Sequence, residues 1–446
     1  MSAAHSTAEE FTVTAPEKSN IRWVVCFLVF LATTINYMDR SVFSNIEPML
    51  HNATFMGWNP LADKFHQPVF DNNFGNVLIY FQIAYGIGFL FAGRVIDKLG
   101  AKLGYTLAIL VWCLSSMSHS LVTSVAGFCI ARIFLGLGES GNFPAAIKAI
   151  TEWFPTEERA KAVGLFNSGA NVSFFVALPL VNFVTGHSSL GWRAAFLATG
   201  SLGLMWLVIW LIFPYNKYKR TATMTQQALE PVVSKSHPLS DILTNRGTYA
   251  FAIGKGLTDG VWWFYLFYLP MFLNRNYGLD THSAYVYILA VYVISSVGSI
   301  FGGTLSGFLM NHGFSVNWGR KITMFAMALL VLPLVLVPHM DKISPHNAWP
   351  AAMIIALAAA AHQGWSANLF ATTGDMFPAS AVSTVVGIGG AAGAAGGAAF
   401  TWIVKHNLSL HPLTVFLAAA SFYLISLAIF HLLVPKLGAW REELAA

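Results

Sequence analysis

The chain has 446 residues, of which 56% are hydrophobic and only 10% are charged, and its formal net charge at pH 7 is +5. About 25% of the residues in a typical soluble domain are charged, so this composition excludes an ordinary soluble protein and predicts a polytopic membrane protein. The positive charge is concentrated in loops and does not indicate nucleic-acid binding. Cys26, Cys113 and Cys129 all fall in apolar runs, where a framework of structural disulfides is implausible.

Twelve apolar runs are long enough to span a bilayer, because a helix needs about 20 apolar residues to cross the hydrocarbon layer. In chain order they lie near residues 22–46, 74–96, 102–121, 124–149, 158–184, 192–213, 248–273, 282–309, 321–338, 348–374, 380–404 and 412–434. We therefore predict an all-α membrane protein with twelve transmembrane helices in a lipid bilayer. Residues 1–20 are polar, so no removable signal peptide is expected.

The lysines and arginines predict the orientation. On this map 16 of the 25 lie in the termini and in the loops after even-numbered spans, and five lie in the loops on the other side. Loops rich in positive charge stay on the cytoplasmic side, so both termini are expected to be cytoplasmic. The external loop from His51 to Asn73 is long, and it is expected either to fold as a small cap or to be disordered.

The first span carries an acid and an arginine, Asp39 and Arg40, inside an apolar run. Each ionised group at mid-bilayer costs about 2.5 to 3.5 kcal/mol on insertion scales, so such groups indicate a functional site. Asn36, Asp39 and Arg40 share one helix face and can line one cavity. The alternative is a packing pair that only neutralises itself.

The fourth span contains a second pair of charges. Arg132 and Glu139 are seven residues apart, which places them two turns and about 10.5 Å apart along one helix face. Gly136 and Gly138 lie between them and allow close helix approach. Close packing explains the glycines but leaves the charges unexplained, so we expect Arg132 and Glu139 to be partners with a function.

Polar side chains in the second and fifth spans are weaker signals. Tyr80 and Gln82 cannot share a helix face, so at most one of them points inward with its neighbours. Asn167 and Asn171 are i and i+4 partners. They either bind sugar hydroxyls or bridge helices.

The seventh and tenth spans add aromatic and amide groups. Trp262 belongs to an aromatic run that forms either an interfacial belt or a surface for the apolar face of a sugar. The tenth span carries His362, Gln363, Trp365 and Asn368, of which Trp365 and Asn368 share a face.

A glycine, acid and base pattern follows the second span. Gly93, Asp97, Lys98, Gly100 and Lys102 match the G-x-x-x-D-[RK]-x-G-x-[RK] loop motif of the major facilitator superfamily, and the match is specific. We expect this loop to act in conformational change.

Two pairs of similar motifs in the first and second parts of the chain predict an internal repeat. Residues 307–313 follow the eighth span with the glycine spacing of the loop motif, but Asn311 replaces the acid. Trp-Phe-Pro at 153–155 and Met-Phe-Pro at 376–378 are each followed by a glycine, Gly164 or Gly387, nine positions after the proline. Two six-helix halves are therefore expected, with a substrate site between them near the midplane. The predicted parts are a tail at 1–21, a first half at 22–213, a linker at 214–247, a second half at 248–435 and a tail at 436–446.

Several longer segments carry a family resemblance. They are residues 36–41, 141–148, 152–155, 257–259, 262–267 and 362–368. On these segments the chain resembles the anion:cation symporter family of the superfamily, and within it the bacterial hexuronate transporters. The resemblance implies a major facilitator fold, a bacterial inner membrane, a monomer, and proton-driven uptake of a sugar acid such as glucuronate or galacturonate, without a cofactor or metal.

The resemblance also implies roles for individual residues. Arg40 would bind the substrate carboxylate. Asp39 and Glu139 would carry protons, and Arg132 would couple the two. From the residues themselves we predict that Trp365 and Asn368 of the second half act on substrate choice, because sugar hydroxyls and a ring face need hydrogen-bonding and aromatic partners. The predicted substrate-binding residues are Tyr37, Arg40, Tyr80, Asn167, Asn171, Trp262, His362, Gln363, Trp365 and Asn368.

Electrostatics agrees with these roles. With Asp39 and Glu139 ionised, the charges of the two acids and two arginines sum to zero, so neither arginine strongly attracts a carboxylate. Protonation of either acid frees positive charge, and the membrane interior favours this neutral form. Arg40 can then hold a carboxylate through two parallel hydrogen bonds. Proton and anion binding therefore strengthen each other.

Individual residues favour or disfavour alternative functions. Gly260 stands where related sequences tend to have proline, and Ala170 stands where galactonate-carrying relatives have a substrate-contacting glutamine. A symporter for galactonate or another aldonate is therefore the main alternative. A cation or drug antiporter is disfavoured by Arg40 and Arg132. An enzyme is not supported, since the sequence shows no nucleophile and base pair, no metal-ligand spacing and no phosphate-binding loop.

Overall fold

The computed structural model describes residues 20–59, 68–216, 237–279, 281–407 and 411–438. Within these ranges every regular element is a helix. Nearly all of the predicted N-terminal tail, most of the predicted linker and most of the predicted C-terminal tail lie outside the described residues.

The helices of the first part of the chain follow the first six predicted spans. They are α1 (Ile21–Asn45), α2 (Glu47–Leu50), η1 (Thr54–Met56), α3 (Pro68–Ser118), η2 (His119–Leu121), α4 (Val125–Glu139), α5 (Asn142–Trp153), α6 (Thr156–His187) and α7 (Arg193–Ile212). α3 contains both the second and the third predicted span, and its backbone breaks at Gly100, where φ is 80° and ψ is 162°. Glycine adopts this conformation without a Cβ clash, so the loop motif makes the turn between two membrane-crossing segments.

The second part of the chain continues in the same way. Its helices are α9 (Leu239–Thr244), α10 (Arg246–Tyr277), α11 (Thr281–Asn311), α12 (Val316–Val331), η4 (Leu332–His339), α13 (Met340–Ile343), α14 (Trp349–Met376), α15 (Val382–Asn407) and α16 (Pro412–Leu433). In the part of the chain that the structure describes, eight helices are long and apolar enough to cross a membrane, and α3 with its two predicted spans is one of them.

The fourth predicted span is divided between α4 and α5. The division falls at Ser140 and Gly141, and Ser140 Oγ donates to the carbonyl of Leu137 over 2.7 Å. Pro144 has no N–H to bond the carbonyl of Ser140 four residues earlier, which weakens the helix at this point. The expectation of one unbroken helix over residues 124–149 is therefore wrong in detail.

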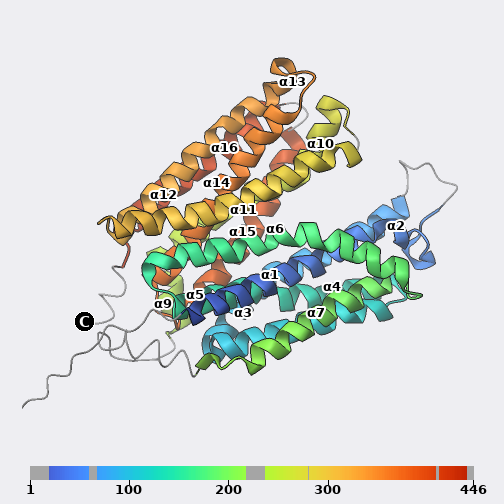
Figure 1. Ribbon diagram of the computed structural model, residues 1–446, viewed down its shortest axis with the longest axis horizontal. Coiled ribbons are helices and arrows are strands. Elements are labelled where there is room, and N and C mark those ends of the chain that lie inside the picture. Colours follow the sequence, from blue (N-terminus) through green and yellow to red (C-terminus); the bar gives the residue numbers. More distant parts are fainter. Residues whose placement is uncertain (1–19, 60–67, 217–236, 280, 408–410, 439–446) are drawn as a thin grey trace, which may run out of the picture.

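Figure 1 shows α1 to α7 gathered in one group of helices and α10 to α14 with α16 in another, while α15 lies between them. The glycines of the sequence repeat lie where the two groups cross. A Cβ atom at Gly164 of α6 would collide with the carbonyl of Ser299 of α11, and one at Gly387 of α15 would collide with the carbonyl of Phe89 of α3. The two glycines thus occupy equivalent places, as expected for a repeat.

The described part of the loop after α1 folds as a cap. His51 stacks on Trp58 with ring centroids 3.5 Å apart, and Nε2 of His51 lies 2.9 Å from Oε1 of Glu47. Leu50 and Met56 are fully buried beneath them. Of the two alternatives for this loop, a small folded cap is found in its described part, and residues 60–67 lie outside that part.

Candidate functional site

The charges predicted in the first and fourth spans meet in the structure. Arg40 of α1 donates hydrogen bonds from Nε and Nη2 to Oε2 of Glu139 of α4, over 3.1 and 2.9 Å. The Glu139 side chain is fully buried and the Arg40 side chain is 14% exposed. Hydrogen bonds between ionised groups are about twice as strong as neutral ones. Arg40 and Glu139 therefore neutralise each other in this conformation.

Aromatic rings surround the Arg40 guanidinium. Its Cζ lies 4.4 Å from the ring centroid of Tyr85, 4.7 Å from that of Tyr37 and 5.3 Å from that of Phe81. A cation over the face of an aromatic ring is attracted by the ring's quadrupole. Tyr37 thus lies in the predicted site, and Tyr85 of α3 joins it.

Tyr80 lies on a different face of α3. Tyr80, Ile83 and Ile87 are 47%, 53% and 49% exposed and recur at helical spacing. An exposed, largely apolar stripe on a membrane helix is suited to contact with lipid. The prediction that Tyr80 binds substrate is therefore not supported, since Tyr85, five residues later, takes the place beside Arg40.

Asp39 and Arg132 are buried in the same group of helices. Ser116 Oγ donates to Oδ1 of Asp39 over 2.6 Å, and Asp39 is fully buried. Arg132 is 1% exposed, and its Cζ lies 4.5 Å from the ring centroid of Phe43. Among the described residues, Nε and Nη2 of Arg132 have no hydrogen-bond partner. Arg132 is thus a buried cation with unused donors.

The expected pairing of Arg132 with Glu139 needs correction. Glu139 forms its ion pair with Arg40 of another helix instead. Two turns of helix separate the Cα atoms of Arg132 and Glu139 by about 10.5 Å, whereas a side chain on a neighbouring helix can meet Glu139 directly. Helical periodicity identified the charged residues but not their partners.

A second ion pair, which the sequence analysis did not single out, lies on α10. Lys255 Nζ is 2.7 Å from Oδ1 of Asp259, one turn later. A Cβ atom at Gly393 of α15 would collide with Oδ2 of Asp259, and one at Gly86, next to Tyr85 on α3, would lie 3.5 Å from the Cβ of Ala394, so this pair lies near the helix that carries Tyr85. The available signal was two charges at i and i+4 inside an apolar run.

The aromatic residues of the seventh and tenth spans pack together. Trp262 of α10 stacks on His362 of α14, with ring centroids 5.2 Å apart and an interplanar angle of 14°. Nδ1 of His362 lies 2.8 Å from the hydroxyl of Tyr423, and Tyr423 also meets the fully buried Trp365 edge to face. Gln363 is buried on the same helix. Trp262 therefore packs inside the bundle and is not part of an interfacial belt.

Asn368 has a packing role. Its Nδ2 donates to the carbonyls of Gly302 on α11 and Gly364 on α14, over 2.8 and 2.9 Å. A side-chain amide has two N–H donors, and both are used on helix backbone. Asn368 therefore joins two helices at a close crossing, while its buried Oδ1 has no hydrogen-bond partner among the described residues, so its part in substrate choice stays a prediction.

The side-chain amides of Asn167 and Asn171 of α6 are buried, and most of their polar atoms have no hydrogen-bond partner among the described residues. They are 4% and 1% exposed. Within the described ranges, both amide atoms of Asn171 and the Oδ1 of Asn167 lack a hydrogen-bond partner. A buried polar group without a partner costs about 1 to 3 kcal/mol. Of the two alternatives for this pair, binding of a ligand's hydroxyl groups explains the burial better than a bridge between helices.

The loop motif joins the two helix groups at the end of the bundle where α1 begins, which we call the Asp97 end. Oδ2 of Asp97 accepts from the backbone N–H and the hydroxyl of Thr384 over 2.7 and 2.6 Å, and Oδ1 accepts from the N–H of Ser383 over 3.2 Å. Lys148 Nζ also lies 2.8 Å from Oδ1. The carboxylate thus satisfies N–H groups at the N-terminus of α15, which helix geometry leaves unbonded.

The other motif residues have different surroundings. A Cβ atom at Gly93 would collide with the carbonyl of Ser383. Lys102 Nζ donates to the carbonyls of Trp210 and Leu211 over 2.8 and 3.0 Å and so satisfies the end of α7. Lys98 is exposed.

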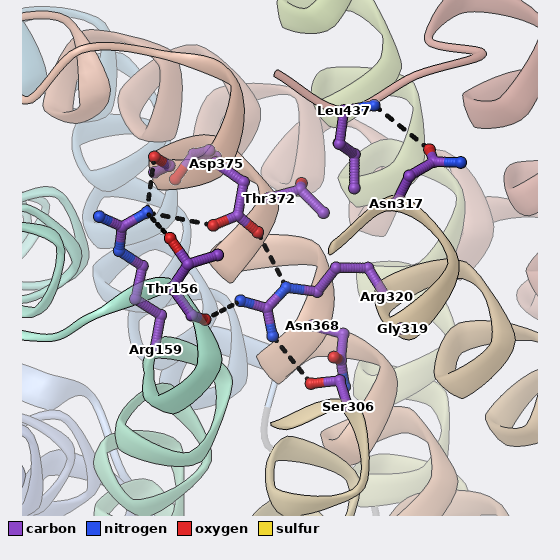
Figure 2. Close-up of polar contacts among 12 residues, drawn as sticks. Thr156, Arg159, Ser306, Asn317, Gly319, Arg320, Asn368, Thr372, Asp375 and Leu437 are labelled. Atoms are coloured by element: carbon purple, nitrogen blue, oxygen red, sulfur yellow. Dashed lines mark hydrogen bonds and ion pairs between the residues drawn. The ribbon is translucent and has the colours of Figure 1, made fainter. Parts of the chain in front are cut away.

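A second acid at the same end was missed from the sequence. Figure 2 shows Asp375 of α14 between two arginines. Arg159 of α6 lies 3.1 Å from Oδ1 of Asp375, and Arg320 of α12 lies 2.8 Å from Oδ2. Arg320 also donates to Ser306 Oγ and to the carbonyl of Thr156. This cluster therefore ties α6 of the first group to α12 and α14 of the second.

Comparison with known proteins gives the family. Residues 29–401 match the model of the Major Facilitator Superfamily. The chain belongs to this superfamily. It is an all-α multi-pass membrane protein with the superfamily's fold, and it is a transporter, not an enzyme.

Named relatives extend the comparison. The chain is 27% identical over 384 residues to the hexuronate transporter of Escherichia coli (strain K12), an alignment that covers 83% of this chain and 84% of the relative. It is 25% identical to the probable galactarate/D-glucarate transporter of Bacillus subtilis (strain 168), with 77% and 76% covered. The fold matches a solved proton:xylose symporter of the superfamily with a TM-score of 0.72 and 15% identity, covering 96% of this chain and 100% of the other.

Proposed function

We propose that this protein is a proton-coupled symporter that imports a sugar acid, hexuronate in the first place, by alternating access. The observation that carries the proposal is the half-buried Arg40 guanidinium, held by the carboxylate of Glu139 and surrounded by Tyr37 and Tyr85. Related transporters of hexuronate and of galactarate/D-glucarate agree with a sugar acid as substrate.

The carboxylate of Glu139 and the carboxylate of the substrate compete for Arg40. When Glu139 is ionised, its carboxylate occupies Arg40. When Glu139 takes up a proton, Arg40 loses its counter-ion and offers the planar donors that suit a carboxylate. Loss of the proton restores the Arg40 to Glu139 pair and displaces the substrate. By reciprocity, the proton strengthens substrate binding as much as the substrate strengthens proton binding.

Asp39 and Arg132 form the second step of this scheme. Asp39 follows Met38 on α1 and precedes Arg40, while Arg132 lies on the same helix as Glu139. Nε and Nη2 of Arg132 have no hydrogen-bond partner among the described residues. We assign it the part of a fixed positive charge that holds Asp39 or Glu139 ionised until a proton arrives.

Sugar hydroxyls and the ring face need other partners. Asn171 supplies a buried amide and Asn167 a buried Oδ1 that have no hydrogen-bond partner among the described residues, and Trp262 stacked on His362 supplies an aromatic surface. The apolar face of a sugar ring packs well on such a surface.

Transport requires the contacts at the Asp97 end to open. With both termini in the cytoplasm, as the positive loops indicate, this end faces the cytoplasm and closes the path to it. Rocking of the two helix groups would break the contacts of Asp97 and Asp375. The protein is assigned to the bacterial inner membrane as a monomer.

Uptake by cells that express the chain tests the proposal. Labelled glucuronate and galacturonate should accumulate, and a protonophore should abolish the accumulation. Labelled galactonate, supplied in parallel, tests the aldonate alternative. Uptake of hexuronate that is unchanged by the protonophore would contradict proton coupling, and no uptake of any of the three acids would contradict the proposed function.

A further inference from the structure

The two side chains of the ion pair on α10 differ in exposure. Phe370 of α14 covers Lys255, whose Nζ lies 4.3 Å from the ring centroid. The side chain of Lys255 is 8% exposed and that of Asp259 is 19% exposed. The carboxylate is therefore the more accessible partner, with the ammonium group behind it.

Asp259 reaches its place between two other helices. A Cβ atom at Gly393 of α15 would collide with Oδ2 of Asp259, so the glycine leaves room for the carboxylate. Ala394, the next residue of α15, lies against α3, because a Cβ atom at Gly86 would be 3.5 Å from the Cβ of Ala394. Gly86 follows Tyr85, which stacks on Arg40, so an acid of the second helix group lies near the helix that carries one of the aromatic rings around the arginine of the first group.

We propose that Lys255 and Asp259 form the subsite for the end of the sugar acid that lies farthest from its carboxylate, and that Asp259 selects substrates whose far end is uncharged. This inference rests on the proposed function and deepens it. With one end of the substrate on Arg40, the other end is directed toward Asp259. A hydroxyl group there donates to the Asp259 carboxylate, as a hexuronate allows.

A second carboxylate at that end is rejected. It would meet the accessible carboxylate of Asp259, while the charge of Lys255 is already balanced by the same Asp259. Specificity of this kind comes from a repulsive group placed against the wrong ligand. The distinction matters for this chain, because its relatives include transporters named for a hexuronate, with one carboxylate, and for galactarate and D-glucarate, with two.

The substitution Asp259→Asn should reverse the preference for a substrate with an uncharged far end. Asparagine keeps the shape and one hydrogen-bond acceptor but leaves Lys255 without a counter-ion. The subsite then changes from neutral to positive, which favours a second carboxylate. The double substitution Lys255→Gln with Asp259→Asn removes both charges and should return the subsite to neutrality.

The test is competition against labelled glucuronate in proteoliposome counterflow at one fixed pH. The quantity measured is the half-inhibitory concentration of galactarate divided by that of galacturonate. We expect Asp259→Asn to lower this ratio by about tenfold or more, since like charges at close range cost more than the 1.4 kcal/mol that equals tenfold in affinity. The double variant should return to within about threefold of the wild-type ratio. Asp241→Asn on α9, an exposed acid, is the matched control and should leave the ratio unchanged.

The outcomes separate this inference from the proposed function. Wild-type protein that binds no sugar acid would refute the function itself. Wild-type protein that binds galactarate as well as galacturonate, or an Asp259→Asn ratio equal to that of wild type, would refute the inference alone. If Asp259→Asn does not fold, the charge swap Lys255→Asp with Asp259→Lys decides, because it keeps the i,i+4 pair and places the cation at the accessible position. The swap should favour galactarate, and an unchanged ratio would overturn the proposal.

Discussion

Each group of helices carries an ion pair with a fully or partly buried acid, and one pair joins two helices whereas the other lies within one helix. Arg40 and Glu139 lie on α1 and α4, 99 residues apart in the chain. Lys255 and Asp259 lie on one helix, at i and i+4. Glu139 is fully buried, whereas Asp259 is 19% exposed. The first pair is part of the contact between two helices, and the second belongs to one rigid element.

This difference suits the two ion pairs to different functions. When the Arg40 to Glu139 pair opens, one buried charge loses its partner, which costs about 3 to 5 kcal/mol in typical proteins. A change of that size can shift a conformational equilibrium, so this pair suits coupling. A pair within one helix moves as a unit, keeps its own charge balance and presents a fixed surface. The Lys255 to Asp259 pair therefore suits recognition.

Removal of Arg40 should have the largest effect. Arg40→Ala leaves the carboxylate of Glu139 buried without its partner and the substrate carboxylate without a ligand. We expect hexuronate affinity to fall at least about 30-fold, since loss of one partner in a buried charge pair costs about 2 to 5 kcal/mol and about 1.4 kcal/mol equals tenfold. Arg40→Lys should also fail, because a point charge does not replace the planar fork. Equilibrium binding to purified protein measures both, with Arg246→Ala, an exposed arginine, as control. Near-normal affinity in Arg40→Ala would refute the assignment.

Glu139→Gln should separate exchange from accumulation. The neutral amide resembles the protonated acid, so the variant should still bind sugar acid and exchange it across the membrane. It cannot release a proton, and return of the empty carrier would leave Arg40 without a counter-ion. Accumulation against a gradient should therefore be lost.

Two measurements on the same proteoliposomes check this. Vesicles loaded with unlabelled hexuronate report counterflow, and empty vesicles under an inward proton gradient report accumulation. If the variant still accumulates hexuronate with the wild-type dependence on external pH, then Asp39 alone carries the proton and Glu139 only packs.

The sequence identified the charged residues in the spans but did not identify the residues that they contact. Apolar run length predicted the membrane spans, and glycine spacing predicted an internal repeat, whose glycines Gly164 and Gly387 lie where the two helix groups cross. Both are local properties of the chain. The partner of Glu139 is set by which helix packs against α4, and helical periodicity within one span carries no such information. Arg132 was therefore chosen where Arg40 is found.

The same limit explains the other differences. Helical spacing predicted one shared face for Asn368 and Trp365, but Asn368 meets the backbone of α11 at Gly302, whereas Trp365 meets Tyr423 of α16. Only the packing of helices distant in sequence decides that contact. The pair of Lys255 and Asp259, in contrast, is local and was readable from its i,i+4 spacing in an apolar run.

Asp97 offers an intermediate case, because it also joins two helices, α3 and α15. If joining helices is what makes a charge act in coupling, Asp97→Asn should slow transport by about tenfold, since hydrogen bonds to charged groups contribute about 1.5 to 3 kcal/mol. Affinity for hexuronate should change less than about threefold. Initial uptake rates and equilibrium binding measured side by side decide this. A matched loss of affinity and rate would place Asp97 in the binding machinery instead.

Asn368→Ala should have the smallest effect and should sharpen the assignment of recognition to Lys255 and Asp259. The substitution removes the amide that donates to Gly302 and Gly364 and adds no charge. Interhelical hydrogen bonds in membranes contribute about 0.6 kcal/mol each on average, so we expect a slightly lower melting temperature. The relative uptake of glucuronate, galacturonate and galactonate should stay as in the wild type, because the amide is engaged by helix backbone. Thermal unfolding in detergent and uptake of the three labelled acids measure the two effects. A changed order among the three acids, with unchanged stability, would return Asn368 to the substrate site and weaken the division of work between the two ion pairs.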